Sequence, residues 1–324
     1  MNREGGREAD LSAPAKPLHS FRSELPTKRY YDKAGESGRM NVRVRPARPA
    51  DKEQLMSFIK DVWRGHDYIP RIWDEWLEDE TGKMLVVEAD GVPLGMSRVR
   101  FLEDGSAWFE GARIHPEFRG RGLASMLGEN SMRIAIDRGV KVFRLTSWSR
   151  NKAARRAIAR MSFKESSRIS AYEPEKGARF APQKGVRLAG MNDLSRVTRL
   201  IRESREFRLG SGVFWDAFAA AFLSPSVIKK LVGEGSVWTT GESVVIARLG
   251  GEGGETWRQV CFLTGKGDAP AKLVKHVFGL KNRVKTIRRI VYLPQGSHLI
   301  RTLRKAGFSR LTSLVLFERT AAKG

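Results

Sequence analysis

The chain has 324 residues, of which 41% are hydrophobic, and a formal net charge of +23. This length predicts two domains of about 150 residues, each able to bury a core, and no apolar run approaches the roughly 20 residues that a membrane span needs. Residues 1–40 contain no apolar signal-peptide segment, and a single cysteine, Cys261, excludes an internal disulfide and a cysteine-based zinc site. We expect a cytoplasmic protein without a metal site.

Positive charge is concentrated in the second half of the chain. From Lys184 onward, basic residues outnumber acidic residues by 15, against 8 in the preceding part. Such a field attracts polyanions, among them nucleic acid, anionic lipid and coenzyme A. The alternative is solubilising charge on exposed helix faces. The densest cluster, Lys281–Arg289, has no interleaved aromatic residues, which disfavours single-strand binding.

The first 40 residues are polar and lack an apolar period, so we expect a disordered tail at 1–40. Met40 stands just before the first strand, and translation starting there is one hypothesis. Residues 41–174 then predict one domain. Its expected elements are a strand at 42–46, helices at 51–62 and 72–77, a hairpin at 84–101 about Asp90-Gly91, a strand at 108–114, a helix at 123–138, a strand at 140–145, a helix at 151–161 and a strand at 169–172.

A Pro- and Gly-containing linker is expected at 175–185, and the pattern then restarts over 186–320. We interpret this repetition as an internal duplication of one fold. The expected elements are a strand at 186–188, a helix at 192–201, an aromatic helical face (Phe214, Trp215, Phe218 and Phe222), strands on both sides of Gly241-Glu242, a strand at 259–263, a helix after Pro270, a strand at 290–293, a helix to Ala306 and a strand at 314–317.

The most informative motif is the hexapeptide Arg119-Gly120-Arg121-Gly122-Leu123-Ala124, between a predicted strand and a predicted helix. Glycines let several backbone N–H groups converge, and the helix adds the positive end of its dipole. A pyrophosphate suits such a loop. The alternatives are a basic surface turn and an RGG-like contact to nucleic acid.

Preceded by His115-Pro116-Glu117-Phe118, the hexapeptide resembles motif A, Arg/Gln-x-x-Gly-x-Gly/Ala, of the GNAT N-acetyltransferase superfamily. The element order of 41–174 resembles that family too. The resemblance implies an α/β (α+β) fold of mixed sheets flanked by helices, with acetyl-CoA as co-substrate. It implies that amides of Arg119, Gly120, Arg121, Gly122, Leu123 and Ala124 hold the pyrophosphate, and that the backbone of Ile114 and His115 holds the pantetheine arm.

The same resemblance extends to the chemistry. Asn151-Lys152-Ala153-Ala154 matches the start of the family's fourth helix, so Asn151 is expected to contact the CoA arm, to cap the helix, or both. Glu110 is the candidate general base, and pairing with Arg98 or Arg113 is an equally weighted alternative. Ile158 stands where the family has the tyrosine acid. Water, Ser147 or Ser149 could substitute, or the thiolate leaves unprotonated.

Acceptor choice is expected to depend on the loop at 63–70. Arg64 could bind a carboxylate, and Asp67 and Tyr68 could orient an amine; the alternative is a loop simply packed by Tyr68 and Trp73. Asp67-Tyr68-Ile69-Pro70 and the run 110–114 also resemble the histidine N-acetyltransferase group. This implies a small amine, an amino acid or a peptide as acceptor.

The second half lacks the motif. At the corresponding place it has 264–270, where Asp268 would oppose a pyrophosphate. We therefore expect a tandem GNAT protein, with an active N-terminal copy and a degenerate C-terminal copy that shapes the cleft of the first. A second anion site using Lys266 is the minority interpretation.

The sequence thus predicts an acetyl-CoA-dependent N-acetyltransferase in which the amine attacks directly within a ternary complex. The alternative is a nucleic-acid-associated protein whose basic C-terminal half docks RNA or DNA, while the acyl-CoA domain modifies or senses the bound partner. The acceptor, the acyl length and the oligomeric state do not follow from the sequence.

Overall fold

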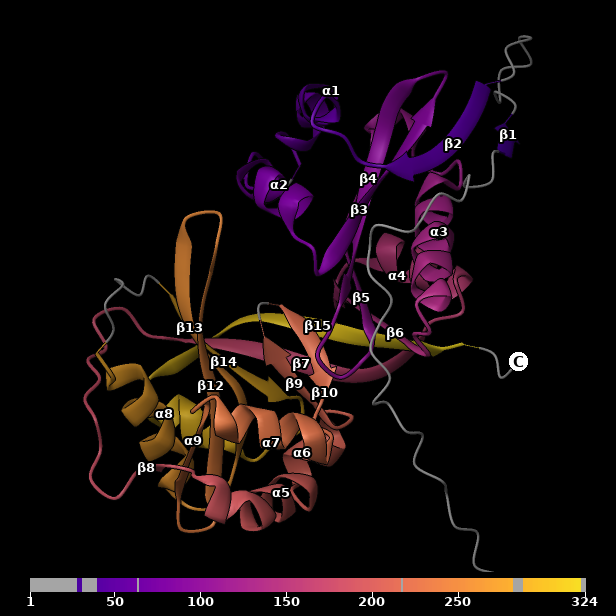
Figure 1. Cartoon of the computed structure of the whole chain (residues 1–324). Helices are drawn as coiled ribbons and strands as arrows, with labels where there is room; N and C mark the ends of the chain where they lie inside the picture. Colours follow the sequence, from indigo (N-terminus) through magenta and orange to yellow (C-terminus); the bar gives the residue numbers. More distant parts are fainter. Residues whose placement is uncertain (1–27, 31–39, 63, 217, 282–287, 322–324) are drawn as a thin grey trace, which may run out of the picture.

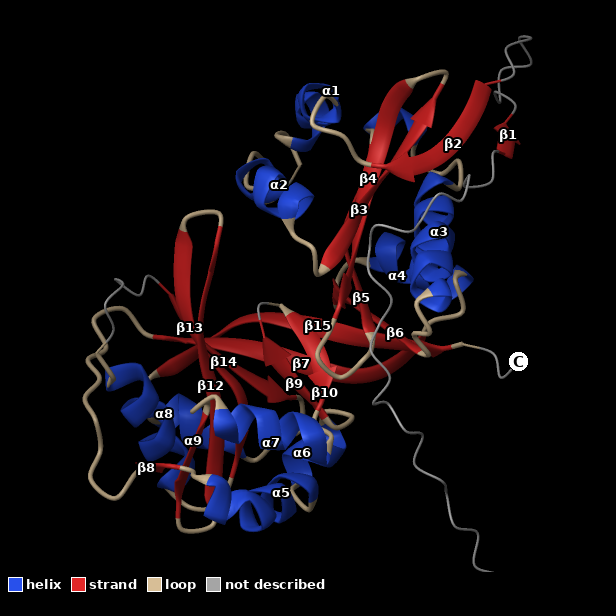
Figure 2. Ribbon diagram, viewed as in Figure 1, coloured by secondary structure: helices blue, strands red, loops and turns tan. Residues whose placement is uncertain are grey.

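The computed structural model describes residues 28–30, 40–62, 64–216, 218–281 and 288–321 (Figure 1). Within these ranges the chain has a mixed α/β fold, in which thirteen strands form one continuous sheet with helices packed against it (Figure 2). The predicted tail at 1–27 and 31–39 and the central part of the basic cluster, 282–287, lie outside the described residues.

The first half confirms the predicted element order. Several bounds differ: the first helix ends at Ile59 rather than Val62, the second begins at Ile69, and the last strand extends over Lys164–Pro174. In addition, Lys28–Tyr30, within the predicted tail, pair with Met40–Val42 as a strand. The elements are β1 (Lys28–Tyr30), β2 (Met40–Pro46), α1 (Asp51–Ile59), α2 (Ile69–Glu78), β3 (Gly82–Ala89), β4 (Val92–Phe101), β5 (Ala107–Ile114), α3 (Leu123–Asp137), β6 (Val142–Trp148), α4 (Lys152–Arg160) and β7 (Lys164–Pro174).

The β3–β4 hairpin is the predicted one. Asp90 and Gly91 have φ of +48° and +85°, as a two-residue hairpin turn requires. Both faces of this hairpin are covered, because side chains alternate across a strand. Met84 packs with α1 and α2, whereas Leu85 packs with α3. The sheet therefore holds α1 and α2 on one face and α3 on the other.

The second half repeats much of this order. Its elements are β8 (Arg187–Leu188), α5 (Leu194–Arg202), α6 (Arg205–Leu209), β9 (Val213–Asp216), β10 (Ala219–Phe222), α7 (Pro225–Gly233), β11 (Val237–Thr240), β12 (Ser243–Glu252), β13 (Glu255–Thr264), α8 (Ala269–Gly279), β14 (Arg288–Pro294), α9 (Leu299–Lys305) and β15 (Phe308–Thr320).

The predicted aromatic helix was wrong. Phe214 and Trp215 lie on β9, and Phe222 ends β10, so the segment is a two-stranded hairpin. Phe214 packs in the cluster with α5 and α7, whereas Trp215 stacks on Tyr292 at a centroid distance of 5.6 Å. Neighbouring aromatic side chains thus enter two different cores, which the alternation of a strand allows.

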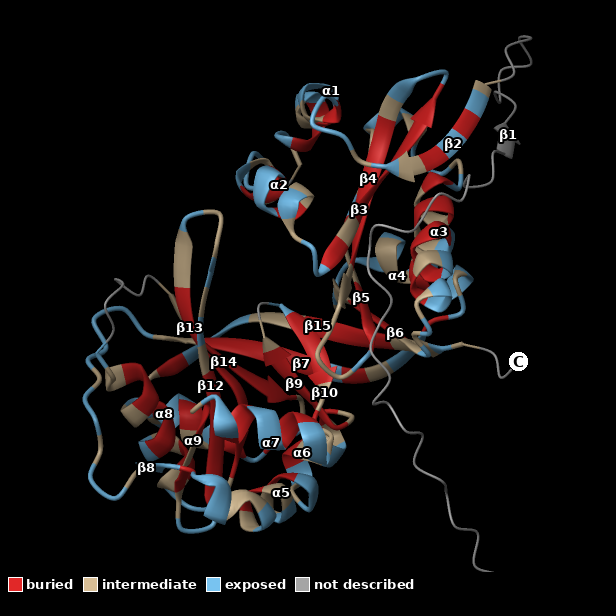
Figure 3. Cartoon of the chain, viewed as in Figure 1, coloured by how far each residue is buried: buried red, intermediate tan, exposed pale blue. Residues whose placement is uncertain are grey.

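The two halves exchange their last strands. The sheet order is β1-β2-β3-β4-β5-β6-β15-β7-β14-β13-β12-β11-β8. Hence β15 pairs with β6 of the first half, β7 pairs with β14 of the second half, and β7 and β15 pair antiparallel in the middle. A boundary at 175–185 divides the chain without dividing the sheet. Buried residues follow the strands and the sheet-facing sides of the helices (Figure 3).

Candidate active site

The glycine-rich loop has the geometry expected of an anion cradle. It runs from Arg119 to Gly122 and leads directly into α3. Gly120 and Gly122 have φ of +77° and +83°, in the left-handed region that favours glycine. Leu123 is buried and fixes the start of α3, while Arg119, Gly120 and Gly122 are exposed. The N–H groups of a first helical turn have no partner within their helix, so they can meet an anion here.

A wedge opens in the sheet beside this loop. The parallel strands β5 and β6 pair only from Ala107/Phe143 to Phe109/Leu145. Beyond that point β5 continues along β4, and β6 continues along β15. Backbone groups of the separated segments can therefore bind an extended ligand that enters from the loop at the end of β5.

Ile114 and His115 differ in what their backbones offer. The His115 N–H donates to the Leu94 carbonyl at 2.8 Å, and its carbonyl accepts from Phe118 at 3.0 Å. Both groups thus have a partner within the chain, while the carbonyl keeps a second lone pair, and the predicted contact of the His115 backbone with the pantetheine arm stays a prediction. Since successive strand amides point to opposite sides, the Ile114 N–H points away from β4 and into the wedge. Ile114 fits the predicted contact.

Two further predicted contacts lie around the wedge. Asn151 is exposed, and its side chain caps α4 by accepting from the Ala154 N–H at 3.0 Å. The guanidinium of Arg121 lies over the Phe118 ring at 5.1 Å, and Arg119 Nε donates to the Ile114 carbonyl at 3.3 Å. The capping role of Asn151 is confirmed, and its predicted contact with CoA stays a prediction.

Glu110 lies on β5, opposite Arg98 on β4. Its carboxylate accepts from Arg98 at 2.7 Å and lies 3.5 Å from Arg100 Nε. The pairing with Arg98 is one of the two roles expected from the sequence. A bulge follows at once, because Gly111 (φ +68°) and Ala112 both face the single residue between Met96 and Arg98. A Cβ at Gly111 would lie 2.6 Å from Trp76.

The predicted acceptor loop is held by its own side chains. The Asp67 carboxylate is fully buried, accepts from Arg113 at 2.6 Å and accepts from the Ile69 N–H at 3.0 Å. Asp67 therefore holds the loop in place, and its predicted contact with an amine stays a prediction. Tyr68 packs edge-on against Trp76 at 5.9 Å, and burial raises the pKa of its hydroxyl. Arg64 is exposed, with φ of +60°.

Sequence reasoning missed one contributor, the β12–β13 hairpin of the second half. Its tip reaches α2 of the first half (Figure 1). Trp76 Nε1 donates to Glu252 at 2.6 Å, the Gly253 N–H donates to Glu75 at 3.0 Å, and Arg71 pairs with Glu255 at 2.6 Å. The run Gly250–Glu255 signals a turn in the sequence, but nothing local signals where that turn docks.

In the second half, protein side chains fill the place that corresponds to the glycine-rich loop, around residues 264–270. The Glu206 carboxylate is buried where β13 ends; it accepts from Thr264 at 3.2 Å and from Ser297 at 2.9 Å. His298 lies 3.3 Å from the same carboxylate and contacts the Gly265 carbonyl. A buried carboxylate beside this loop opposes a phosphate, in addition to Asp268.

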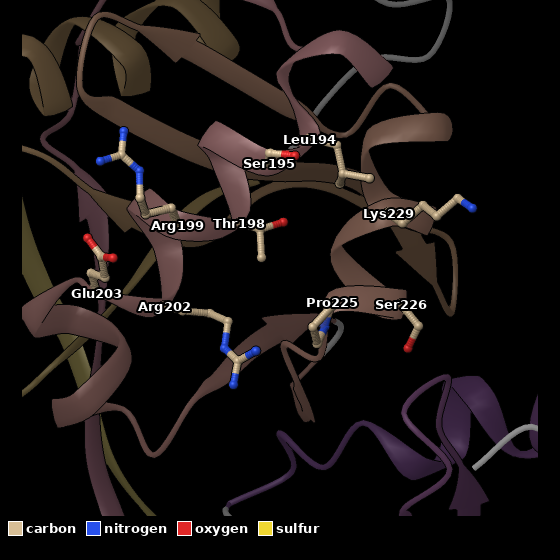
Figure 4. A pocket seen from close by; sticks show the side chains of 9 residues that line it. All are labelled: Leu194, Ser195, Thr198, Arg199, Arg202, Glu203, Pro225, Ser226 and Lys229. Atoms are coloured by element: carbon tan, nitrogen blue, oxygen red, sulfur yellow. The ribbon is translucent and has the colours of Figure 1, made fainter. Parts of the chain in front are cut away.

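A separate hollow of about 600 Å³ lies between α5 and α7. Figure 4 shows Thr198 and Arg202 of α5 facing Pro225 and Ser226 of α7 across it. Arg199 and Lys229 also line this hollow. Its hydroxyls and cations suit an anionic group, whereas the Glu203 carboxylate, which also lines it, opposes one. The hollow belongs to the second half rather than to the wedge.

A left-handed glycine cradle, a helix behind it and a wedge between parallel strands together define an acyl-CoA transferase domain. Residues 51–163 match the family model of the Acetyltransferase (GNAT) family. Residues 51–163 are therefore a GNAT acetyltransferase domain.

Curated relatives match stretches of about 100 residues. The chain is 30% identical over 99 residues to a histidine N-acetyltransferase of Oreochromis niloticus, and 31% identical over 97 residues to one of Xenopus tropicalis. These matches cover 30% and 29% of this chain, and they span only 29% and 30% of the respective relatives' length.

A solved GCN5-related N-acetyltransferase from Sphaerobacter thermophilus aligns with 87% of this chain and 96% of its own, with a TM-score of 0.57 and 15% identity. That likeness concerns the fold, and it extends over both halves. Among the described residues no helix is long and apolar enough to cross a membrane, and no group of three or more His, Cys, Asp or Glu residues is placed to hold a metal.

Proposed function

We propose that the chain is an acetyl-CoA-dependent N-acetyltransferase that acetylates a primary amine of a small molecule, amino acid or peptide. The observation that carries the proposal is the loop 119–122, with two left-handed glycines at the start of α3 and beside the wedge between β5 and β6. We place the active site in the first half, regard the second half as a degenerate copy of the same fold, and assign the enzyme to the cytoplasm.

Each part of the site has a separate role in binding acetyl-CoA and the acceptor. Loop amides and the positive end of α3 bind the pyrophosphate, with Arg119 and Arg121 adding positive charge. The Ile114 N–H holds the pantetheine arm and so aims the thioester along the wedge. Because Glu110 is engaged by Arg98 and Arg100, we assign it the role of fixing the geometry and charge of β5. The acceptor enters between β5 and α2, and attacks the thioester directly.

The acceptor is tested by a panel. Free CoA thiol is followed with acetyl-CoA and, in turn, L-histidine, other amino acids, polyamines and peptide N-termini. L-Histidine comes first because of the relatives' names. We expect turnover with at least one amine, lost in the Gly122→Asp variant together with the thermal shift caused by acetyl-CoA. A wild-type chain without turnover on the whole panel would contradict the proposal.

A second candidate function rests on the hollow between α5 and α7. Its three lining cations, Arg199, Arg202 and Lys229, have no ion-pair partner among the described residues. They favour the alternative in which the basic second half docks RNA or DNA. Binding of such an interface weakens steeply with salt. A labelled RNA or DNA that shows no binding at low salt would eliminate this candidate.

A further inference from the structure

Between α2, β5 and the β12–β13 hairpin lies a cluster of polar side chains drawn from both halves. The hairpin presents Glu252 at the end of β12, immediately before Gly253 and Gly254, whose φ of +58° and +76° make the tight turn. A Cβ at Gly253 would lie 2.8 Å from Ile72, so the tip rests directly on α2. The contact is close enough to fix the position of Glu252.

Glu252 is connected to the reacting edge of β5 through Trp76. The indole N–H donates to the Glu252 carboxylate at 2.6 Å, and the same indole ring lies against Gly111. Trp76 is buried, and the Arg98 guanidinium covers its ring at 4.8 Å. Its orientation is therefore fixed from several sides, and it links Glu252 to the residue that follows Glu110.

The two carboxylates of this cluster have different environments. Glu110 is held by two guanidinium groups. Glu252 has one neutral donor, Trp76, and no cation within ion-pair distance in the described ranges. Burial raises the pKa of Glu252, and the charge of Glu110 adds to this effect, while the Trp76 hydrogen bond and the arginines of β4 oppose it. The charged and titratable groups around Glu252 lie on β5 (Glu110), β4 (Arg98 and Arg100) and α2 with its preceding turn (Tyr68 and Glu75).

We infer that Glu252, supplied by the second half, is the carboxylate that binds the acceptor's ammonium group and takes its proton. The inference rests on the proposed function and names the acceptor class as a cationic primary amine. A half-buried carboxylate without a counter-cation favours an incoming ammonium. A carboxylate with a raised pKa is also a better base than a solvated one.

In the proposed acetyl transfer, one proton of the ammonium group passes to Glu252 and a second passes to the CoA sulfur. The ammonium gives one proton to the Glu252 carboxylate, and the resulting neutral amine forms the N–C bond with the acetyl carbonyl. The C–S bond breaks, and the CoA sulfur leaves with its electron pair. The sulfur takes the second proton from the amine nitrogen, so that amide, CoA thiol and one proton on Glu252 result. That proton then passes to solvent.

The test compares Glu252→Gln with Glu242→Gln in the full chain, using acetyl-CoA and the best amine of the panel. Gln keeps the acceptor for Trp76, so the fold is preserved, and Glu242 is exposed in the turn before β12, at the opposite end of that strand. We expect Glu252→Gln to lower kcat/KM by about 100-fold and to abolish the acidic limb of its pH profile. Glu242→Gln should stay within about twofold of wild type, and Glu252→Asp should restore part of the rate and the acidic limb.

Measuring the affinity for acetyl-CoA distinguishes failure of the Glu252 inference from failure of the proposed function. Glu252→Gln with unchanged acetyl-CoA affinity and a lost acidic limb supports the inference. Glu252→Gln with wild-type kcat/KM and an intact limb overturns it while leaving the proposed function in place. Wild-type chain that binds no acetyl-CoA, or acetylates no amine, overturns both.

Discussion

If the loop before α3 binds the pyrophosphate, an Asp substitution should weaken acetyl-CoA binding at the glycine before α3 but not at the glycine after it. Gly120 precedes α3 with φ of +77°, and Gly139 follows it with φ of +82°. Both are exposed, and a Cβ at either would meet no heavy atom of the described chain within 4 Å. Gly120→Asp and Gly139→Asp are therefore a matched pair that adds the same side chain at the same backbone conformation.

Their effects on stability follow from backbone conformation and the helix dipole. The left-handed conformation costs an L-residue about 1–2 kcal/mol at either position. The dipole then favours a carboxylate near the start of α3 and disfavours one near its end, by about 0.3–1 kcal/mol. Gly139→Asp should thus be the less stable variant, with a Tm a few degrees below that of Gly120→Asp.

The affinity for acetyl-CoA should show the opposite order. One carboxylate at about 6 Å from a pyrophosphate of about two charges costs roughly 1.4–5.5 kcal/mol, for an effective dielectric constant of about 80 to 20. Gly120→Asp should therefore weaken binding at least about tenfold, whereas Gly139→Asp should bind as wild type does. Calorimetric titration gives both dissociation constants, and thermal unfolding gives the stabilities.

Dissociation constants of the two variants within about twofold of one another would contradict this prediction. Such a result would mean that the loop before α3 does not face the pyrophosphate. A large loss of affinity in Gly139→Asp alone would be equally damaging, since it would attribute binding to the overall stability of α3.

Three other outcomes are expected. Glu88 is buried, and although burial opposes it, hydrogen bonds from two β2 arginines lower its pKa; Glu88→Gln should cost about 2–3 kcal/mol of unfolding free energy at neutral pH. Because the folded-state pKa lies below the unfolded one, this difference should shrink as the pH falls below about 4.3, which unfolding at several pH values measures. Gly253→Ala should reduce kcat/KM more than Gly254→Ala. Both substitutions place an L-residue at a positive φ, but only the Cβ at position 253 would clash with α2. Equal losses would argue against docking of the hairpin. Burial raises the pKa of the Cys261 thiol well above its usual value, so a thiol reagent should label it only after unfolding, and rapid labelling of folded protein would contradict its burial.

Local features of the first half were predictable because their causes are local. Alternating apolar residues and the Asp90-Gly91 turn define the β3–β4 hairpin, and the glycines of the cradle need their left-handed backbone whatever surrounds them. The same kind of reasoning failed for Phe214 and Trp215. The aromatic spacing there fits a helix, but Phe214 and Trp215 are buried in two separate cores, and only a strand directs neighbouring side chains to opposite sides.

Features that join distant segments could not be predicted. β15 pairs with β6 of the first half, and β7 pairs with β14 of the second half. A buried strand has the same apolar sequence pattern whichever strand it pairs with, so the sequence does not indicate this exchange. Glu252 was missed for the same reason, since its role depends on where the hairpin tip docks on α2. The pairing of Glu110 with Arg98 was foreseen because the two face each other across neighbouring strands.

The central claim is that one acyl-CoA cradle exists in this chain, at 119–124 of the first half. Calorimetric titration of the full chain with acetyl-CoA tests it most directly. We expect one molecule bound per chain, and binding at least about tenfold weaker in the Gly120→Asp variant. Two molecules per chain, or binding that survives the substitution unchanged, would contradict it.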